Sequence, residues 1–142
     1  KLYDKEIIIF DDYAHHPTEI KATLSSVKTA YKNRRIIAIF QPHRYSRTEL
    51  LLNYFKDAFE YADNLIITDI YAAGENEIAG ISGETIFDIV KNGNNKTKYI
   101  KNIDDIIPEL DKMKKDGDII LTLGAGNISR ISNEYAKKLL DS

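Results

Sequence analysis

The 142-residue sequence predicts a single α/β domain in which a mainly parallel sheet of five to six strands carries helices on both faces. The first observation is that five short apolar runs alternate with five helical patterns, and no repeat or linker interrupts this alternation. The second is that several of these runs are apolar almost throughout, which is typical of strands buried on both faces of a parallel sheet. The third is the length, which suits about one domain in the usual range of roughly 100–200 residues.

The expected strands are the five apolar runs. They span residues 6–10, 35–40, 64–70, 96–100 and 119–123. The run at 96–100 is short and only weakly apolar, so we expect it near an edge of the sheet. The connections between parallel strands should be right-handed crossovers.

The first two expected helices each follow a polar loop. Pro17 can begin a helix because its missing N–H is not needed at the first helical position. After the second strand, Ser46 and Glu49 have the spacing of a capping box, which predicts a helix from residue 48 onward. Their apolar faces are formed by Ile20, Leu24, Val27 and Tyr31 in the first helix, and by Leu51, Leu52, Phe55, Ala58 and Phe59 in the second.

The other three helices are expected later in the chain. Ser82 can cap a helix that carries Ile86, and residues 102–115 have the apolar spacing of another. Pro108 interrupts that second pattern, so we expect this helix to start late or to kink. A final amphipathic helix follows the last strand.

The composition is that of an ordinary globular protein and excludes several classes of partner. Hydrophobic residues make up 43% and charged residues 30% of the chain. The formal net charge of −2 gives no long-range attraction for nucleic acid or for an anionic membrane, so any anion site must be local. The absence of cysteine excludes disulfides and thiolate metal sites. No apolar run approaches the roughly 20 residues that a membrane-spanning helix needs.

Polar clusters follow the first, second, third and fifth expected strands, directly where each strand ends. The carboxyl ends of parallel strands share one edge of a sheet, and ligands of open α/β sheets bind there. We therefore expect these four clusters to meet in one site.

The loop after the second strand, residues 40–48 (Phe-Gln-Pro-His-Arg-Tyr-Ser-Arg-Thr), indicates an anion site. It brings together His43, Arg44 and Arg47, and arginine has a planar fork that matches carboxylate and phosphate oxygens. Arg47 lies near the start of a helix, which is the unfavourable end for a cation, and a bound anion would offset that penalty. The alternative is a surface arginine pair bonded to some of the 22 acidic residues.

The loop after the first strand suits a nucleoside. The carboxylate of Asp12, at a strand end, can accept both ribose hydroxyls, as in dinucleotide sites. The aromatic ring of Tyr13 can stack on a base. The structural alternative is that Asp12 caps the next turn and Tyr13 packs as half-buried core.

All three histidines of the chain, His15, His16 and His43, lie in these two loops. With Asp11 and Asp12 they offer ligand types that zinc accepts, but no H-E-x-x-H or similar spacing is present, and we predict no metal site in this chain. Either His15 or His16 could instead cap the helix that follows. If these residues did bind zinc, the chain would be expected to act as a zinc hydrolase.

The run Gly124-Ala125-Gly126 contains half of a dinucleotide fingerprint, but it follows the last strand and not the first. It is better explained by a close approach of the backbone at the start of the last helix. No G-x-x-x-x-G-K-[ST] sequence occurs, so the chain cannot by itself hold a triphosphate in the manner of a phosphate loop.

Five motifs, taken in order and spacing, resemble the C-terminal domain of the Mur ligases, which build the peptide of peptidoglycan. They are residues 11–19 (Asp-Asp-Tyr-Ala-His-His-Pro-Thr-Glu), 40–48, 69–75 (Asp-Ile-Tyr-Ala-Ala-Gly-Glu), 80–83 (Gly-Ile-Ser-Gly) and 124–126. Within the family, the second motif resembles the enzymes that join L-alanine to UDP-N-acetylmuramate. Murein tripeptide ligase shares the first motif but has an Asn-containing sequence after the proline of the second.

The resemblance implies a three-domain enzyme, of which residues 1–142 are the third, Rossmann-like domain. An N-terminal domain would hold the UDP-sugar, and a central domain would carry the ATP phosphate loop and most of the contacts to Mg²⁺. The third domain would close over the cleft and help to bind ATP and the incoming amino acid. ATP would phosphorylate the muramate carboxylate, and the amine of L-alanine would attack the acyl phosphate. Because the chain begins at Lys1 and lacks a phosphate loop, we expect an excised domain that is inactive alone. The expected location is the bacterial cytoplasm.

The resemblance also implies roles for individual residues. It assigns nucleotide binding to Asp12, Tyr13 and His15, substrate binding to His43, Arg44 and Arg47, and catalysis to His15 and Arg44. Asn127 stands where the family often has Asp, so no role is predicted for that loop. A stand-alone nucleotide-binding module is the alternative outside the ligases.

Overall fold

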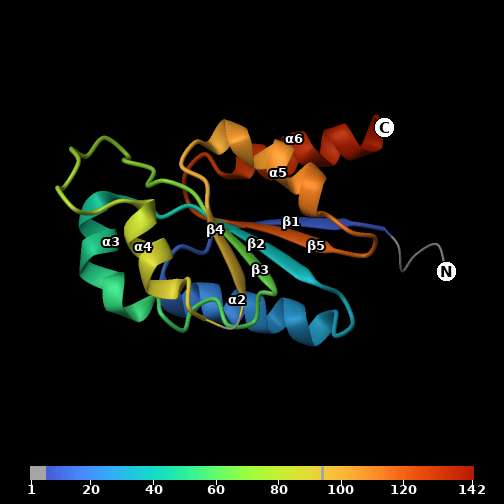
Figure 1. Cartoon of the computed structure of the whole chain (residues 1–142), viewed down its shortest axis with the longest axis horizontal. Helices are drawn as coiled ribbons and strands as arrows, with labels where there is room; N and C mark the ends of the chain where they lie inside the picture. The colour runs from blue at the N-terminus through green and yellow to red at the C-terminus, as the bar shows by residue number, and fades with distance from the viewer. Residues whose placement is uncertain (1–5, 94) are drawn as a thin grey trace.

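A parallel sheet forms the centre of the computed structural model, which describes residues 6–93 and 95–142 (Figure 1). The described part of the chain contributes five strands in the order β1-β5-β2-β3-β4, and every pair of neighbours is parallel. The strands are β1 (Ile8–Asp12), β2 (Ile36–Phe40), β3 (Asn64–Ile67), β4 (Lys96–Tyr99) and β5 (Ile119–Leu123). The predicted fold class is confirmed, and β4 lies at an edge as expected.

Helices cover both faces of this sheet (Figure 1). They are α2 (Pro17–Ala30), α3 (Tyr45–Leu51), α4 (Gly83–Val90), α5 (Ile106–Met113) and α6 (Ser129–Leu140), with short 3₁₀ turns η1 (Leu52–Tyr54) and η2 (Ile103–Asp105). Figure 1 shows α5 and α6 on one side of the sheet and α2, α3 and α4 on the other. Among the described helices, none is both long and apolar enough to cross a membrane.

The two central strands, β2 and β5, are buried along their whole length. Alternate side chains of β2 point to opposite faces, so that Ala38 and Phe40 join the apolar cluster under α2 and α4, and Ile37 and Ile39 join the cluster under α5 and α6. This burial on both faces explains why the strand sequences are apolar throughout.

The connections place all strand ends at one edge. From β1 to β4 the chain steps across the sheet in one direction, with α2, α3 and α4 on one face. It then returns from β4 to β5 through α5 on the other face. The direction of the step along the sheet and the face that the connecting helix covers reverse together, so that all the crossovers keep the same hand. The loops after β1, β2, β3 and β5 therefore emerge side by side.

Two helices differ from, or refine, the sequence prediction. The α3 helix begins at Tyr45, with Arg44 as its N-cap, so the predicted capping box at Ser46 is wrong. It ends at Leu51, and the buried residues Phe55 and Phe59 lie in the bend and turns that follow η1, not in a continued α-helix. The helix predicted over 102–115 starts late, as expected, because α5 begins at Ile106 after η2.

Candidate functional site

The loops after β1, β2, β3 and β5 meet at the carboxyl edge of the sheet. The rings of His15 and His43 lie 5.5 Å apart, which joins the first loop to the second. The ring of His43 stacks on Tyr71, from the third loop, at 5.7 Å. From the fifth strand's loop, the Gly124 N–H donates to the carbonyl oxygen of Asp12 at 3.1 Å. The predicted convergence of the polar clusters is therefore what the structure contains.

In the second loop, the backbone of Arg44 is held in an unusual conformation. Its φ of 69° lies in the left-handed region, which costs a non-glycine residue about 1–3 kcal/mol. Its N–H donates to the Tyr71 carbonyl at 2.8 Å, and its carbonyl accepts from the Thr48 N–H and hydroxyl. Contacts on both sides of the residue therefore enforce a conformation that an isolated loop would avoid.

The side chains of Arg44 and Arg47 are exposed on this edge. Neither forms an ion pair with any carboxylate in residues 6–93 and 95–142, so the alternative of an acid-paired surface arginine pair is not observed there. They line an open hollow of about 400 Å³ together with His16, Ser46, Leu50 and Leu51. Two guanidinium groups without a carboxylate partner, at the rim of a hollow, suit an anionic ligand.

In the first loop, Asp12 already has two partners within the chain. Its Oδ1 accepts from the Ala14 N–H at 2.8 Å, and its Oδ2 lies 3.4 Å from the Thr23 hydroxyl. The structural alternative for Asp12, a cap of the next turn, is thus present, and it leaves further lone pairs on the carboxylate. For Tyr13 the core alternative is wrong, because 74% of this residue is exposed. A second hollow, of about 410 Å³, is lined by Asp12, Tyr13, Ala14, His15, Glu19, Ala22 and Thr23.

The two adjacent histidines have different surroundings. His16 is the N-cap of α2: its Nδ1 accepts from the Thr18 N–H at 3.1 Å, and its own N–H donates to Glu19. The Glu19 carboxylate accepts hydrogen bonds from the backbone N–H groups of His16 and His15, and these bonds, chiefly that from His16, lower the pKa of the Glu19 carboxyl. His15 Nδ1 lies 3.1 Å from the carbonyl oxygen of Tyr13, which can only accept, so this nitrogen carries the proton. In the neutral ring the lone pair is then on Nε2.

His43 is half-buried, and its Nδ1 has no hydrogen-bond partner among the residues that the structure describes. Burial lowers the pKa of His43 below its ordinary value, and the nearby charges of His15, Arg44 and Arg47 lower it further. The imidazole is therefore held in its neutral form over a wider pH range than a free histidine.

The described residues offer no support for a zinc site. No group of three or more histidine, aspartate or glutamate side chains among them is arranged to hold a metal ion. The capping of α2 uses one imidazole, and Asp11 accepts a hydrogen bond from Thr122 at 2.6 Å. The zinc hydrolase alternative therefore has no geometric basis in this part of the chain.

The fifth strand's loop approaches the second and third loops closely. A Cβ on Gly126 would lie 2.5 Å from Cγ of Tyr71 and 2.6 Å from Oε1 of Gln41. The Gln41 amide donates to Asn127 at 2.7 Å. The predicted close approach of the backbone is confirmed. No role was predicted for Gln41, Tyr71 or Asn127, because no local sequence pattern reveals contacts between separate loops.

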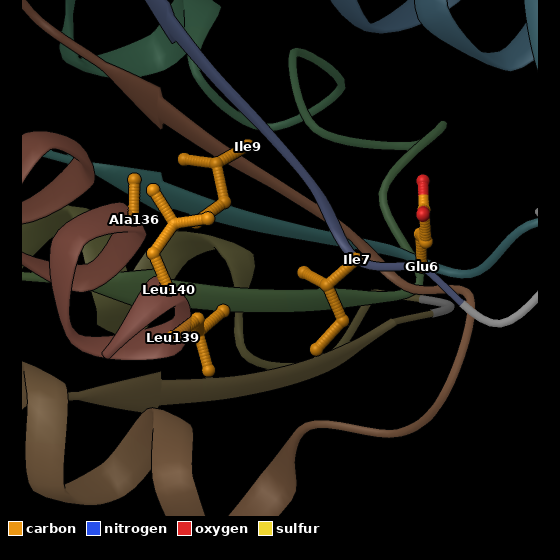
Figure 2. Close-up of a pocket in the computed structure, with 6 residues that line it drawn as sticks. All are labelled: Glu6, Ile7, Ile9, Ala136, Leu139 and Leu140. Carbon is orange, nitrogen blue, oxygen red and sulfur yellow. The ribbon is translucent and has the colours of Figure 1, made fainter. Parts of the chain in front are cut away.

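A different kind of hollow lies away from this edge, between β1 and α6 (Figure 2). Its volume is about 570 Å³, and Figure 2 shows the side chains of Ile7 and Ile9 facing those of Leu139 and Leu140. Apart from Glu6, its lining is apolar. It lacks the polar groups that fix a small ligand in place, so the carboxyl edge is the better candidate site.

Comparison with known proteins agrees with this architecture. The family model "Mur ligase, glutamate ligase domain" matches residues 2–126. The chain is 76% identical over 139 residues to UDP-N-acetylmuramate–L-alanine ligase of Brachyspira hyodysenteriae, covering 98% of the chain and 30% of that protein. It is 47% identical over 137 residues to the ligase of the same name from a Sulfurihydrogenibium species, covering 96% of the chain and 30% of that protein.

Solved structures share the fold. A UDP-N-acetylmuramate–alanine ligase of Thermotoga maritima superposes with a TM-score of 0.78 at 26% identity, over 96% of this chain and 27% of that one. A murein peptide ligase of Psychrobacter arcticus superposes with a TM-score of 0.73 at 24% identity, over 95% of this chain and 28% of that one, and this likeness concerns the fold alone. The chain spans about 30% of the length of these curated relatives. Because the family model matches residues 2–126, which is most of the chain, the chain belongs to the Mur ligase family and corresponds to the domain that this model describes.

Proposed function

We propose that this chain is the C-terminal domain, which binds ATP and the amino acid, of an ATP-dependent ligase that joins L-alanine to UDP-N-acetylmuramate in peptidoglycan synthesis. The observation that carries the proposal is that Asp12 and Tyr13 open onto the same sheet edge as Arg44 and Arg47. The relatives from Brachyspira hyodysenteriae and Sulfurihydrogenibium, which carry this ligase name, support the choice of L-alanine. The tripeptide-adding alternative has less support, because residues 40–48 resemble the sequence of the alanine-adding enzymes after the proline of this motif.

In this proposal the first loop binds ATP. The exposed ring of Tyr13 stacks on the adenine, and the lone pairs that remain on the Asp12 carboxylate accept the ribose hydroxyls. His15 belongs to the same loop, and its ring lies beside that of His43 from the second loop. In this proposal His15 therefore faces both the nucleotide and the reaction centre. Magnesium would be held mainly outside this chain, because the described residues include no suitable cluster of ligands.

The second loop binds the other substrates. His43, Arg44 and Arg47 contact the carboxylate groups of L-alanine and the muramoyl chain, since guanidinium forks match carboxylates. ATP phosphorylates the muramate carboxylate, the alanine amine attacks the resulting acyl phosphate, and inorganic phosphate leaves. Arg44 would stabilise the anionic tetrahedral intermediate that forms when the amine attacks, and His15 would lie beside the reacting groups.

The remaining parts of the enzyme lie outside the 142 residues. The chain covers about 30% of its relatives, which leaves room for a UDP-sugar domain and for a central domain that carries the phosphate loop. Closure of the three domains over the edge would exclude water and protect the acyl phosphate from hydrolysis. The proposed location is the bacterial cytoplasm.

The test is the substitution Arg44→Ala in the full-length protein. We expect L-alanine-dependent release of phosphate to fall by more than about tenfold, because one charge that stabilises the intermediate is lost. The melting temperature should hardly change, because the Arg44 side chain makes no capping hydrogen bond. Lys56→Ala, which removes an exposed cation from the turn after η1, is the matched control. Normal turnover in Arg44→Ala would contradict the proposal.

A further inference from the structure

The third loop, residues 70–80, holds the second loop in two places. The first is backbone pairing: the Tyr71 N–H donates to the Pro42 carbonyl at 2.9 Å, and the Arg44 N–H donates to the Tyr71 carbonyl at 2.8 Å. The second is a single carboxylate. Glu75 accepts from the Ser46 N–H at 3.1 Å and from the Ser46 hydroxyl in a short hydrogen bond.

These contacts replace a cap that α3 does not have. The first N–H groups of a helix lack intrahelical partners and are normally satisfied by the side chain of the N-cap. Here the N-cap is Arg44, whose side chain makes no capping bond. Glu75 supplies the missing acceptor from another loop, and the hydrogen bonds from Ser46 lower the pKa of its carboxyl. The charged form of Glu75 is thus the one that suits this contact.

The capped segment carries both arginines. Ser46 lies between Arg44, with its φ of 69°, and Arg47. Because Glu75 holds the backbone at Ser46, it also holds the backbone from which both arginine side chains extend. The positive charge of Arg44 lies near enough to Glu75 to add to the Ser46 hydrogen bonds in lowering the pKa of the Glu75 carboxyl.

We propose that Glu75 is a positioning residue for substrate recognition, which acts through Ser46 to hold Arg44 and Arg47 in their binding orientation. The inference rests on the proposed function, in which these arginines bind the substrate carboxylates. Glu75 itself is not required to touch any substrate.

The first test is kinetic and uses the full-length protein. Glu75→Ala should raise the KM for L-alanine or UDP-N-acetylmuramate by roughly tenfold, because small displacements of positioning groups are costly. The KM for ATP should stay within about twofold, since the nucleotide residues are on another loop. Glu75→Gln retains one acceptor oxygen and should give an intermediate KM. Glu77→Gln is the matched control, because Glu77 lies on the same loop and, within the described residues, the carboxylate bonded to Ser46 is that of Glu75 and not that of Glu77.

The second test is hydrogen exchange of the same proteins, and it does not depend on activity. Peptides that cover residues 43–48 should exchange faster in Glu75→Ala, and peptides from β2 and β5 should be unchanged. An unchanged KM for every substrate in Glu75→Ala would overturn the inference, as would a parallel rise of all three KM values with a lowered melting temperature. If the wild-type protein releases no phosphate in response to L-alanine, the proposed function fails, and exchange at residues 43–48 still decides whether Glu75 holds the loop.

Discussion

The position of the His43 ring depends on two residues that are distant in sequence. The ring stacks on Tyr71 with an angle of 19° between the planes. Tyr71 in turn packs over Gly126, where a Cβ would lie only 2.5 Å from Cγ of the tyrosine. A side chain at position 126 must therefore displace the Tyr71 ring, and the His43 ring would lose its support.

Gly126→Ala should accordingly disturb the site more than the fold. We expect a loss of stability of about 1–3 kcal/mol, as for other overpacked positions, and a fall in ligase kcat/KM of about tenfold or more. Chemical denaturation and phosphate release in the full-length protein measure the two effects. In a Tyr71→Gly background the Cγ and Cβ atoms of residue 71, which the new methyl group would meet at 2.5 and 2.8 Å, are both absent. Only the flexible Gln41 amide then lies close, so adding Gly126→Ala should lower kcat/KM much less than it does in the wild type. A full additional loss in that background would refute the explanation.

At the scale of elements, the sequence predicted strands better than helix ends. Buried strands were predictable because a parallel sheet covered on both faces demands continuous apolar runs, as in β2 and β5. The bounds of α3 were not predictable, because its start is capped by Glu75 from a distant loop. The left-handed backbone conformation of Arg44 could not be predicted for the same reason, because Tyr71, 27 residues further along the chain, holds it through a backbone hydrogen bond. The convergence of the site loops followed from strand direction alone, whereas the contacts between loops did not.

The N-cap of α2 provides a test of two roles for one histidine. His16 caps the helix and also lines the hollow beside Arg44 and Arg47. His16→Ala should lower the free energy of unfolding by about 1 kcal/mol, whereas His16→Asn, a good N-cap, should retain it. If capping is the whole role, His16→Asn should also keep normal ligase activity. Thermal unfolding and phosphate release of both variants separate capping from ligand binding, and an inactive, stable His16→Asn would assign His16 to the site.

At the scale of the whole molecule, the two ends of the sheet differ in function: one end carries polar loops, and the other carries an ion pair that connects two strands. The carboxyl ends of the strands carry the candidate site, and at the amino ends Arg35 pairs with Asp118, with Nη2 to Oδ2 at 2.6 Å. Asp118 is 2% exposed and also accepts from the Lys115 N–H. Its carboxylate is the main cause of the raised pKa of Arg35. This pair ties the start of β2 to the turn before β5.

Asp118→Ala should therefore destabilise the domain without altering the site. We expect a loss of about 3 kcal/mol, because the change leaves a partly buried guanidinium unpaired. Urea unfolding measures this loss, and the KM values of the full-length protein, measured well below its melting temperature, should match the wild type. A changed KM for L-alanine would mean that the two ends of the sheet are coupled.

The left-handed backbone at Arg44 has a consequence for protein engineering. Glycine adopts such a conformation without strain, so a search for heat-resistant variants would favour glycine at position 44. The same exchange would delete a guanidinium group from the rim of the hollow. If Arg44 binds the substrate as proposed, selection for thermal stability alone would yield a more stable but less active enzyme, so position 44 should be left unchanged in such a selection.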